Sequence, residues 1–318
     1  MEYRKLGKNG PLVSVIGFGS WAVGGGGWEG SWGFQDDRLS IQSIRCALDA
    51  GINFFDTAPA YGLGHSETIL GKALKSNRNN VVIATKCGLV WDTEKKITKD
   101  VSYASVIQQA EASLRRLDTD YIDLLLVHWP DNATPIDETL LAMQKLVQDG
   151  KVRYIGVSNF NIRLLNKSLA VCHLDALQPP YSVLRPAAET DLLPHCLNNG
   201  IGVIAYSPLA SGLLSGKYTT DSRFTPEDWR SRSSWHIRQG LQKNLARVEK
   251  LKPIASELRI TLPQLAIAYI LAHPALTSAL IGTRATDHIL SLLPASEIKL
   301  SPSVISEVRK IAFEAFTP

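Results

Sequence analysis

The chain has 318 residues, of which 45% are hydrophobic and 20% are charged, and its formal net charge is +4. This balance is that of an ordinary globular protein, and so mild a charge argues against nucleic acid or a membrane as a partner. The four cysteines lie far apart, and neither CxxC nor HExxH occurs. We therefore expect reduced thiols, no bound metal and a cytoplasmic location, since the N-terminus is also too polar for a signal peptide.

Short apolar runs alternate with helical patterns along the whole chain. The runs are Val13–Gly19, Asn53–Ala58, Val81–Lys86, Ile122–Trp129, Val152–Asn159, Asp175–Tyr181, Gly202–Ser207 and Ser278–Thr283. Helical spacing is found over Arg38–Ala50, Ser66–Ala73, Ala104–Leu117, Ile136–Gln148 and Leu262–Leu271. Nearly continuous apolar runs are typical of parallel strands covered by helices. The repeated order predicts an α/β fold, a (β/α)8 TIM barrel formed by residues 1–318 as a single domain.

Three segments depart from the repeat. Residues 1–12 predict an N-terminal β-hairpin, with Tyr3–Lys5 and Leu12–Ser14 as flanking strands, which would plug the bottom of the barrel. After Leu300 the chain offers one further helix, about Pro302–Phe313. Residues 213–240 form a long polar connection rich in Arg, Ser and Trp, and loops of this length are either mobile or functional.

The segment Gly17–Ala22 matches the G-x-G-x-x-A form of the dinucleotide fingerprint. That fingerprint needs a helix directly after it, whereas here Val23 and four glycines follow, which cannot start a stable helix. We interpret the segment as a flexible loop after the first strand, on the catalytic face of the barrel. The candidates for a substrate pocket on this face are Trp21, Trp28, Trp32 and Trp129.

Four polar residues lie at or just beyond the ends of three successive predicted strands: Asp56, Tyr61, Lys86 and His128. A buried lysine is costly unless it is paired, and Asp56 on the neighbouring strand is the natural partner of Lys86. The charge of Lys86 would lower the pKa of Tyr61 from about 10 and make Tyr61 a better proton donor. His128 would orient a carbonyl oxygen, so that Tyr61 protonates this oxygen while hydride reaches the carbon.

Each of these residues alone has an ordinary structural explanation, because buried polar groups are usually just satisfied by hydrogen bonds. Their concentration on three consecutive strand ends weakens that explanation. A barrel hydrolase or lyase would instead need paired carboxylates or clustered metal ligands at the strand ends, and the sequence offers no such set. Because neighbouring strand residues face opposite sides, we expect Cys87 to be buried beneath a helix if Lys86 points into the barrel.

Several segments resemble motifs of the aldo-keto reductase superfamily, in the family's order: GINFFDTAPAYGLGHSE, VVIATKCG, YIDLLLVHWPD, GKVRYIGVSNF and AYSPLASGLLSGKY. The resemblance extends from about Tyr3 to Gly282. The opening GFGSWAVGG is similar to the branch of bacterial stress-associated and inositol-related reductases, and the potassium-channel β subunits are more distant relatives. The resemblance implies a carbonyl reductase in which Asp56, Tyr61, Lys86 and His128 are the catalytic tetrad.

The resemblance also implies a binding site for NADPH/NADP+. Ser158, Asn159 and Gln178 would bind the nicotinamide carboxamide, and Tyr206 would stack under the ring. The pyrophosphate would be covered by Ser207, Pro208, Leu209, Ser211, Gly212 and Lys217. At the eighth βα turn, the cofactor would meet Gly282, Thr283, Arg284 and His288. The guanidinium of Arg284 favours NADPH over NADH, whereas His288 and Leu292 replace the family's usual Gln and Asn near the adenine.

Two functions stay open on this basis. The first is NADPH-dependent reduction of a small-molecule aldehyde or ketone by a monomer. The second is a cofactor-sensing regulatory subunit on the same scaffold with slow turnover, although the complete tetrad disfavours a protein without activity. For residues 213–240 the alternatives are a solvated surface insertion and a gate that closes over the cofactor.

Overall fold

The computed structural model describes residues 1–131 and 133–314. Eight parallel strands form a closed barrel, in which the last strand pairs with the first. They are β3 (Ile16–Gly19), β4 (Phe54–Asp56), β5 (Val82–Cys87), β8 (Ile122–Val127), β9 (Val152–Ser158), β10 (Ala176–Gln178), β11 (Gly202–Ala205) and β12 (Leu276–Gly282). Each predicted apolar run overlaps one of these strands, so the predicted TIM barrel is confirmed.

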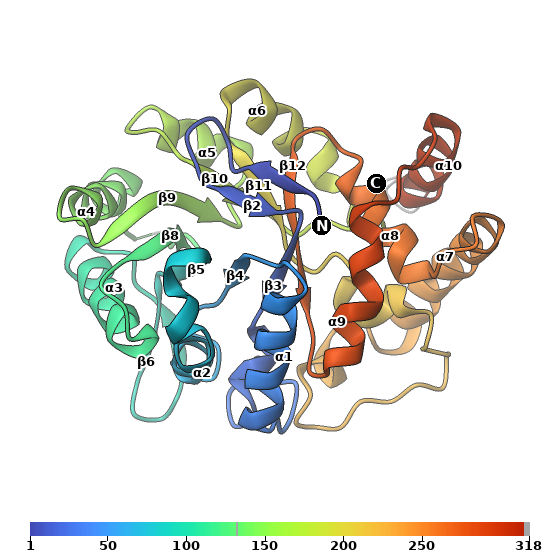
Figure 1. Cartoon of the computed structure of the whole chain (residues 1–318), viewed down its shortest axis with the longest axis horizontal. Helices are drawn as coiled ribbons and strands as arrows, with labels where there is room; N and C mark the ends of the chain where they lie inside the picture. Colours follow the sequence, from blue (N-terminus) through green and yellow to red (C-terminus); the bar gives the residue numbers. More distant parts are fainter. Residues whose placement is uncertain (132, 315–318) are drawn as a thin grey trace.

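Helices surround the barrel (Figure 1). They are α1 (Asp37–Asp49), α2 (His65–Leu74), α3 (Tyr103–Leu117), α4 (Ile136–Gln148), α5 (Ile162–Leu169), α6 (Leu192–Asn199), α7 (Arg238–Glu257), α8 (Leu262–Leu271), α9 (Thr286–Leu292) and α10 (Pro302–Phe313). The predicted helices are confirmed, including the C-terminal one. The sequence did not predict α5, α6, α7 or α9, and α7 begins inside the expected loop of residues 213–240.

The N-terminal hairpin closes one end of the barrel. Its strands β1 (Tyr3–Lys5) and β2 (Leu12–Ser14) pair antiparallel, and Figure 1 shows them lying across the barrel. Leu6 and Val13 are fully buried and pack with Phe54 and Leu124 inside the barrel. The predicted plug is therefore confirmed. The first predicted run is divided, because Val13 belongs to the hairpin and the barrel strand starts at Ile16.

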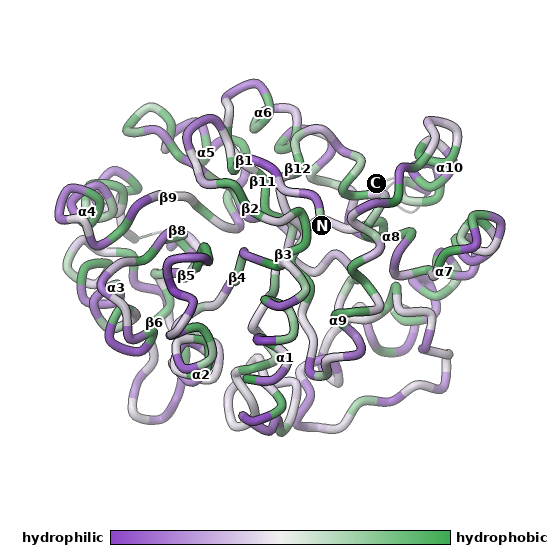
Figure 2. The backbone as a smooth tube through the Cα atoms, viewed as in Figure 1, coloured by the Kyte–Doolittle hydropathy of each residue, from purple (hydrophilic) through white to green (hydrophobic). Residues whose placement is uncertain are grey.

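Two apolar layers follow from the alternation of strand residues. On β5, Val82 and Ala84 belong to the cluster inside the barrel, whereas Ile83 and Cys87 belong to the layer beneath the helices. Cys87 is 1% exposed, and burial raises the pKa of its thiol to about 12. The prediction of a buried, outward-facing thiol is confirmed. In Figure 2 hydrophobic and hydrophilic colours alternate along the surrounding helices, as expected for helices with one buried face.

Shorter elements complete the fold. The 3-10 helices are η1 (Trp21–Gly24), η2 (Lys75–Asn80), η3 (Ala187–Glu189), η4 (Ala210–Ser215), η5 (Trp229–Arg232) and η6 (Leu293–Ser296). A second hairpin, which the sequence did not predict, pairs β6 (Leu89–Trp91) with β7 (Ile97–Lys99). The G-x-G-x-x-A segment is followed by the single turn η1 and not by an α-helix, which agrees with its interpretation as a loop.

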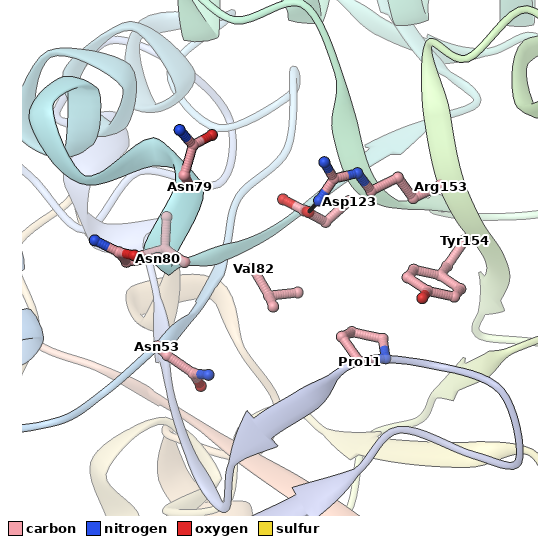
Figure 3. Close-up of a pocket in the computed structure, with 9 residues that line it drawn as sticks. Pro11, Asn53, Asn79, Asn80, Val82, Asp123, Arg153 and Tyr154 are labelled. Atoms are coloured by element: carbon pink, nitrogen blue, oxygen red, sulfur yellow. Dashed lines mark hydrogen bonds and ion pairs between the residues drawn. The ribbon is translucent and has the colours of Figure 1, made fainter.

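A hollow of about 400 Å³ opens at the hairpin end of the barrel, with Pro11 on one side and Arg153 and Asp123 on the other (Figure 3). Asp123 is buried, and its carboxylate pairs with Arg78 at 2.7 Å and with Arg153 at 3.1 Å. The same carboxylate accepts a hydrogen bond from the backbone N–H of Ile83 at 3.0 Å. These charged groups satisfy one another, so we interpret this end of the barrel as structural.

Among the described residues, no single helix is long and apolar enough to cross a membrane. The pair α7 and α8 reaches the required length and composition together, with a bend of 90° between the two helices. Most residues of α8 are buried in the molecule, as in a core helix.

Candidate active site

Lys86 lies at the centre of the predicted tetrad. Its ammonium donates to Asp56 Oδ1 at 2.7 Å, to the carbonyl of Thr57 at 2.8 Å and to the hydroxyl of Tyr61 at 3.3 Å. An ammonium has three hydrogens, and this arrangement gives each of them an acceptor. Lys86 is 1% exposed, and burial lowers its pKa, while the charge of Asp56 opposes that change. The three acceptors fit the charged form of the side chain.

Tyr61 lies in the loop between β4 and α2. Burial raises the pKa of its phenol well above the ordinary value of 10.0, and the charge of Asp56 raises it further. The sequence led us to expect the opposite direction, because the ammonium of Lys86 favours the phenolate. The expectation was wrong for the free protein, since the loss of solvation outweighs the ammonium at 3.3 Å. Tyr61 is therefore a protonated phenol at neutral pH.

His128 follows β8, and its ring lies edge-on to the ring of Tyr61, with a centroid distance of 5.8 Å. Burial lowers the pKa of its imidazole well below 6.5, and the charge of Lys86 lowers it further. The ring is thus neutral and carries one N–H. Its Nδ1 atom is buried and has no hydrogen-bond partner among the described residues. A neutral ring of this kind can donate one hydrogen bond to a substrate oxygen.

The residues predicted for the nicotinamide lie beside the tetrad and are bonded to it. Gln178 donates to Asp56 Oδ2 at 2.7 Å, and Ser158 donates to the carbonyl of Gln178 at 2.8 Å. Asn159 donates to the carbonyl of His128 at 2.9 Å and accepts from the hydroxyl of Tyr206 at 2.8 Å. The bond between Gln178 and Asp56 was not predicted, and it makes Gln178 a partner of the tetrad as well as a candidate for the carboxamide.

The loop predicted to cover the pyrophosphate has an unusual backbone. Ser207, Ala210 and Ser211 have φ angles of 54°, 49° and 55°, and Gly212 has a φ of 96°. Left-handed residues of this kind are costly, and they cluster where a backbone turns its amides toward an anion. Pro208 and Leu209 lie inside this loop, so the predicted segment is one continuous turn. Its conformation fits the expected role.

The residues predicted for the adenosine end lie on the surface. Arg284 is exposed and donates to the carbonyl of Trp32 at 3.1 Å, and Lys217 approaches His288 at 3.5 Å. Thr283 is buried and closes its own turn, donating to the carbonyl of Ala285 at 2.6 Å. Gly282, the last residue of β12, is exposed beside them, whereas Leu292 belongs to the core. The structure thus brings most of these residues together but bonds Arg284 to the first loop.

Two of the four predicted tryptophans lie against Tyr61. The rings of Trp21 and Trp28 each have a centroid 6.2 Å from that of Tyr61, and the Trp21 ring is nearly parallel to it. Trp32 packs edge-on against Trp21 at 5.4 Å. Trp129 is 39% exposed, and the ammonium of Lys99 lies 5.5 Å from its ring centroid. Trp21 and Trp28 therefore lie next to Tyr61, and Trp32 packs against Trp21.

Trp229 and Arg230 belong to the segment of residues 213–240, for which the sequence left a gate over the cofactor open, but neither was predicted for the substrate pocket. The ring of Trp229 stacks on Trp21 at 5.3 Å. Arg230 is buried, pairs with Asp228, and places its guanidinium 4.5 Å from the ring centroid of Trp32. The backbone N–H of Trp229 also bonds to the carbonyl of Ser31 at 2.9 Å. A tryptophan next to an arginine in a long loop was the available signal, since such pairs often anchor a loop.

Within residues 1–131 and 133–314, no three His, Cys, Asp or Glu side chains are grouped so that they could hold a metal ion. The candidate site consists of the buried Lys86–Asp56 pair and the two neutral groups beside it, Tyr61 and His128.

Comparison with curated proteins gives relatives over nearly the full length. The chain is 37% identical over 326 residues to an NADH-specific methylglyoxal reductase from Escherichia coli (strain K12), and the alignment covers 98% of this chain and 98% of that protein. It is 36% identical over 329 residues to a probable voltage-gated potassium channel subunit beta from Arabidopsis thaliana, covering 98% of this chain and 96% of that one.

Solved structures are similar in the same way. A glycerol dehydrogenase from Gluconobacter oxydans aligns with a TM-score of 0.88 and 36% sequence identity, covering 98% of this chain and 94% of that one. The model of the aldo/keto reductase family matches residues 15–312. The matched range includes every residue of the site described above. This chain is therefore a member of the aldo/keto reductase family, a family of oxidoreductases that use a nicotinamide cofactor.

Proposed function

We propose that this protein reduces aldehydes and ketones to alcohols with NADPH, and that Tyr61 is the general acid. The observation that carries the proposal is the line of contacts from Asp56 through Lys86 to the hydroxyl of Tyr61. It lies on the same side of the barrel as the nicotinamide residues, which are bonded to Asp56 and His128. The bound cofactor supplies the hydride, and the protein supplies the proton and the geometry.

The raised pKa of Tyr61 suits this role. A phenol that is protonated at neutral pH keeps its proton until a strong base forms beside it. The oxygen of a reduced carbonyl is such a base, much stronger than a phenolate, so the transfer from Tyr61 is favourable when charge develops on that oxygen. The ammonium of Lys86, 3.3 Å from the phenol, then stabilises the phenolate that is left. Asp56 keeps the ammonium charged and in position.

The role of His128 is to orient the carbonyl. Its ring is neutral because burial and the charge of Lys86 both disfavour the imidazolium. A neutral N–H polarises the carbonyl oxygen without competing with Tyr61 as an acid. The edge-on arrangement of the two rings lets both groups reach one oxygen atom.

NADPH is the proposed cofactor because of Arg284. Its guanidinium is exposed at the end of the site away from the tetrad, and it uses one Nη1 hydrogen on the carbonyl of Trp32. The remaining donors of the fork are free to pair with a 2′-phosphate. The E. coli relative is named for NADH, so the proposal of NADPH rests on the local residue Arg284 and not on similarity to that relative.

The proposed substrates are small carbonyl compounds. Trp21 and Trp28 lie next to the phenol of Tyr61, so the substrate must fit between aromatic rings. The relatives whose names include a substrate act on methylglyoxal and glycerol, which are small polar molecules. The Arabidopsis relative named as a channel subunit supports a second candidate, a cofactor-sensing subunit with slow turnover.

The test is oxidation of NADPH, followed by its absorbance, with benzaldehyde and with methylglyoxal as substrates. We expect turnover by the wild type, and a loss of at least about 100-fold in kcat for Tyr61→Phe, the usual scale for a positioned acid. NADPH binding, followed by quenching of tryptophan fluorescence, should be unchanged in this variant. Near-normal turnover of Tyr61→Phe would show that the proton comes from elsewhere. Tight NADPH binding with negligible turnover by the wild type would favour the regulatory function.

A further inference from the structure

The loop that carries Tyr61 rests directly on the first loop of the barrel, with only hydrogen atoms between the two backbones. A Cβ atom built on Gly24 would lie 2.7 Å from the backbone nitrogen of Gly62 and 2.8 Å from the carbonyl carbon of Tyr61. In the other direction, a Cβ atom on Gly62 would collide with the carbonyl group of Gly24. Backbone atoms cannot turn aside as a side chain can, so two glycines are needed at this contact.

Buried hydroxyl groups hold the same two loops together beneath the glycines. Ser66, at the start of α2, donates to the carbonyl of Ser20 at 3.0 Å and to its hydroxyl at 2.8 Å. The hydroxyl of Thr57 lies 3.1 Å from the same Ser66 oxygen. All three side chains are fully buried. Because Ser20 precedes η1 and Ser66 follows the Tyr61 loop, this network fixes both ends of the contact.

The distance from Lys86 to Tyr61 makes this support important. At 3.3 Å it is the longest of the three hydrogen bonds of the ammonium, close to the limit of such a bond. Moving the backbone of Tyr61 outward by a few tenths of an ångström, roughly the shift that a crowded Cβ demands, would break it. The network between Asp56 and Lys86 does not depend on the Tyr61 loop and would be unaffected.

We infer that Gly24 is a positioning residue for the catalytic acid: its contact with Gly62 sets the distance between the Tyr61 hydroxyl and Lys86. Gly24 touches neither of these groups and lies outside the motif segments that contain the tetrad. Its position at the end of η1, the turn that begins with Trp21, joins the wall of the carbonyl site to the loop of the acid. This inference rests on the proposed role of Tyr61.

The test compares Gly24→Ala with Gly26→Ala. Neither glycine has a left-handed φ, so neither substitution strains the backbone by itself. A Cβ on Gly26 meets its nearest neighbour, Gly33, at 3.7 Å, which is ordinary contact, so this variant is a matched control in the same loop. We expect Gly24→Ala to lower kcat by about 10- to 100-fold, the scale of a small misplacement of a reacting group. Gly26→Ala should keep the wild-type kcat, and both should keep the KM for NADPH.

A double-mutant cycle with Tyr61→Phe separates positioning from general damage. If Gly24 acts through the phenol, Gly24→Ala adds no further loss of kcat to Tyr61→Phe. An equal fractional loss in both backgrounds would overturn the inference, and so would a wild-type kcat in Gly24→Ala. If Tyr61→Phe itself has normal turnover, the proposed acid is wrong, and that result is distinct from a failure of the positioning role.

A second variant addresses the case in which Gly24→Ala does not fold. Ser66→Ala removes the hydroxyl network from the same contact, and Ser40→Ala removes a buried hydroxyl on α1 that bonds to the carbonyl of Asp36. We expect a loss of kcat of about threefold to tenfold for Ser66→Ala only, again absent in the Tyr61→Phe background. Equal kcat values for the two serine variants would count against the inference.

Discussion

The two ends of the site are built differently. At the carbonyl end, Asp56 and Lys86 lie on or at the end of barrel strands, and their polar atoms are joined in one buried network. At the adenosine end, Arg284, Lys217 and His288 are all exposed. Arg284 and Lys217 lie on loops and His288 on α9, and the side-chain nitrogens of Lys217 and His288 are 3.5 Å apart. The first end is complete in the free protein, whereas the second has polar groups with unused donors. The Asp56–Lys86 pair proposed for catalysis is thus held by barrel strands, whereas the residues proposed for the adenosine lie outside the strands or at the end of one.

The largest expected effect is a loss of activity at the carbonyl end of the site. Lys86→Met should lower kcat by at least about 100-fold, because Tyr61 loses the charge that stabilises its phenolate. It should also destabilise the fold by about 3 kcal/mol, because the charge of Asp56 is left buried and unpaired. Activity is measured by NADPH oxidation and stability by urea unfolding.

The double variant Asp56→Asn/Lys86→Met separates these two losses. It removes the unpaired charge, so it should recover much of the stability while turnover stays low. Recovery of turnover together with stability would show that Lys86 is needed only for folding.

The carbonyl end was predictable from the sequence because strand periodicity decides which side chains face into the barrel. Lys86 and Cys87 illustrate this, since alternation alone placed one inside and the other beneath the helices. The direction of the pKa change of Tyr61 was not predictable, because it depends on how completely the loops remove solvent from the phenol. The bond from Gln178 to Asp56 was missed for a related reason: it joins β10 and β4, which are far apart in the sequence and are not neighbours in the barrel.

The adenosine end was predicted less well, and the reason is the segment of residues 213–240. Apolar periodicity is absent there, so the sequence indicated a polar loop. In the structure, Arg230 is buried between Trp32 and Phe224, at 4.5 Å from each ring centroid, and pairs with Asp228. Cation–π contacts and a local ion pair replace the apolar core that periodicity would reveal. The sequence alone does not show that Arg230 will contact a ring as distant along the chain as that of Trp32.

A smaller effect, on the pH dependence of stability, is expected at His236, in the buried part of residues 213–240. His236 is 3% exposed, and burial, followed by the charge of Arg230, lowers its pKa to about 4. Below pH 6.5, His236 takes up a proton in the unfolded chain but not in the folded chain. The contribution of His236 to the free energy of unfolding is therefore complete above pH 6.5. It is lost as the pH falls toward 4, by about 3 kcal/mol in total at about 1.4 kcal/mol per pH unit.

Urea unfolding of His236→Asn between pH 7 and pH 4 tests this sign. We expect a shallower loss of stability than in the wild type, and no change for the control His195→Asn on α6, remote from this cluster. Identical pH dependence of His236→Asn and the wild type would show that other groups cause the loss. Residues 228–236 hold the first loop of the barrel. As the pH falls, we therefore expect the adenosine end of the site to lose its structure at a higher pH than the tetrad does.

At Arg284 a smaller effect, on the choice of cofactor, is expected. Replacing it with Ala should raise the Kd for NADPH about tenfold, or about 1.4 kcal/mol, and leave that for NADH unchanged. Arg232→Ala is the matched control, because Arg232 is also exposed and also donates to a carbonyl of the first loop, that of Glu29 at 2.9 Å. Titration of both cofactors distinguishes the roles. Equal weakening of NADPH and NADH in both variants would mean that Arg284 only holds the loop.

The smallest effect concerns motion at the adenosine end. Residues 217–227 are mostly exposed, whereas Asp228, Arg230 and His236 are buried. The backbone N–H of Trp229 bonds to Ser31, and Asp228 pairs with Trp32 in an isolated bridge. A gate over the whole of residues 217–235 would have to break these contacts with the first loop. A gate limited to 217–227 would keep them and break instead the contacts of Tyr218 and Phe224 with Arg230. We therefore expect the movable part of the segment to end at Asp228.

Hydrogen exchange with and without NADPH distinguishes these possibilities. Amides of residues 217–227 should exchange quickly in the free protein and be protected by the cofactor, because Lys217 then binds its phosphates and orders the chain. Amides of residues 228–236 should be protected equally in both states, since their partners are already in place. A cofactor-dependent change of exchange in both halves would favour the larger gate of residues 217–235, in which the cofactor also orders residues 228–236. Equal exchange of residues 217–227 in the two states would mean that this half is a solvated insertion, and that the open end of the site binds the cofactor without closing over it.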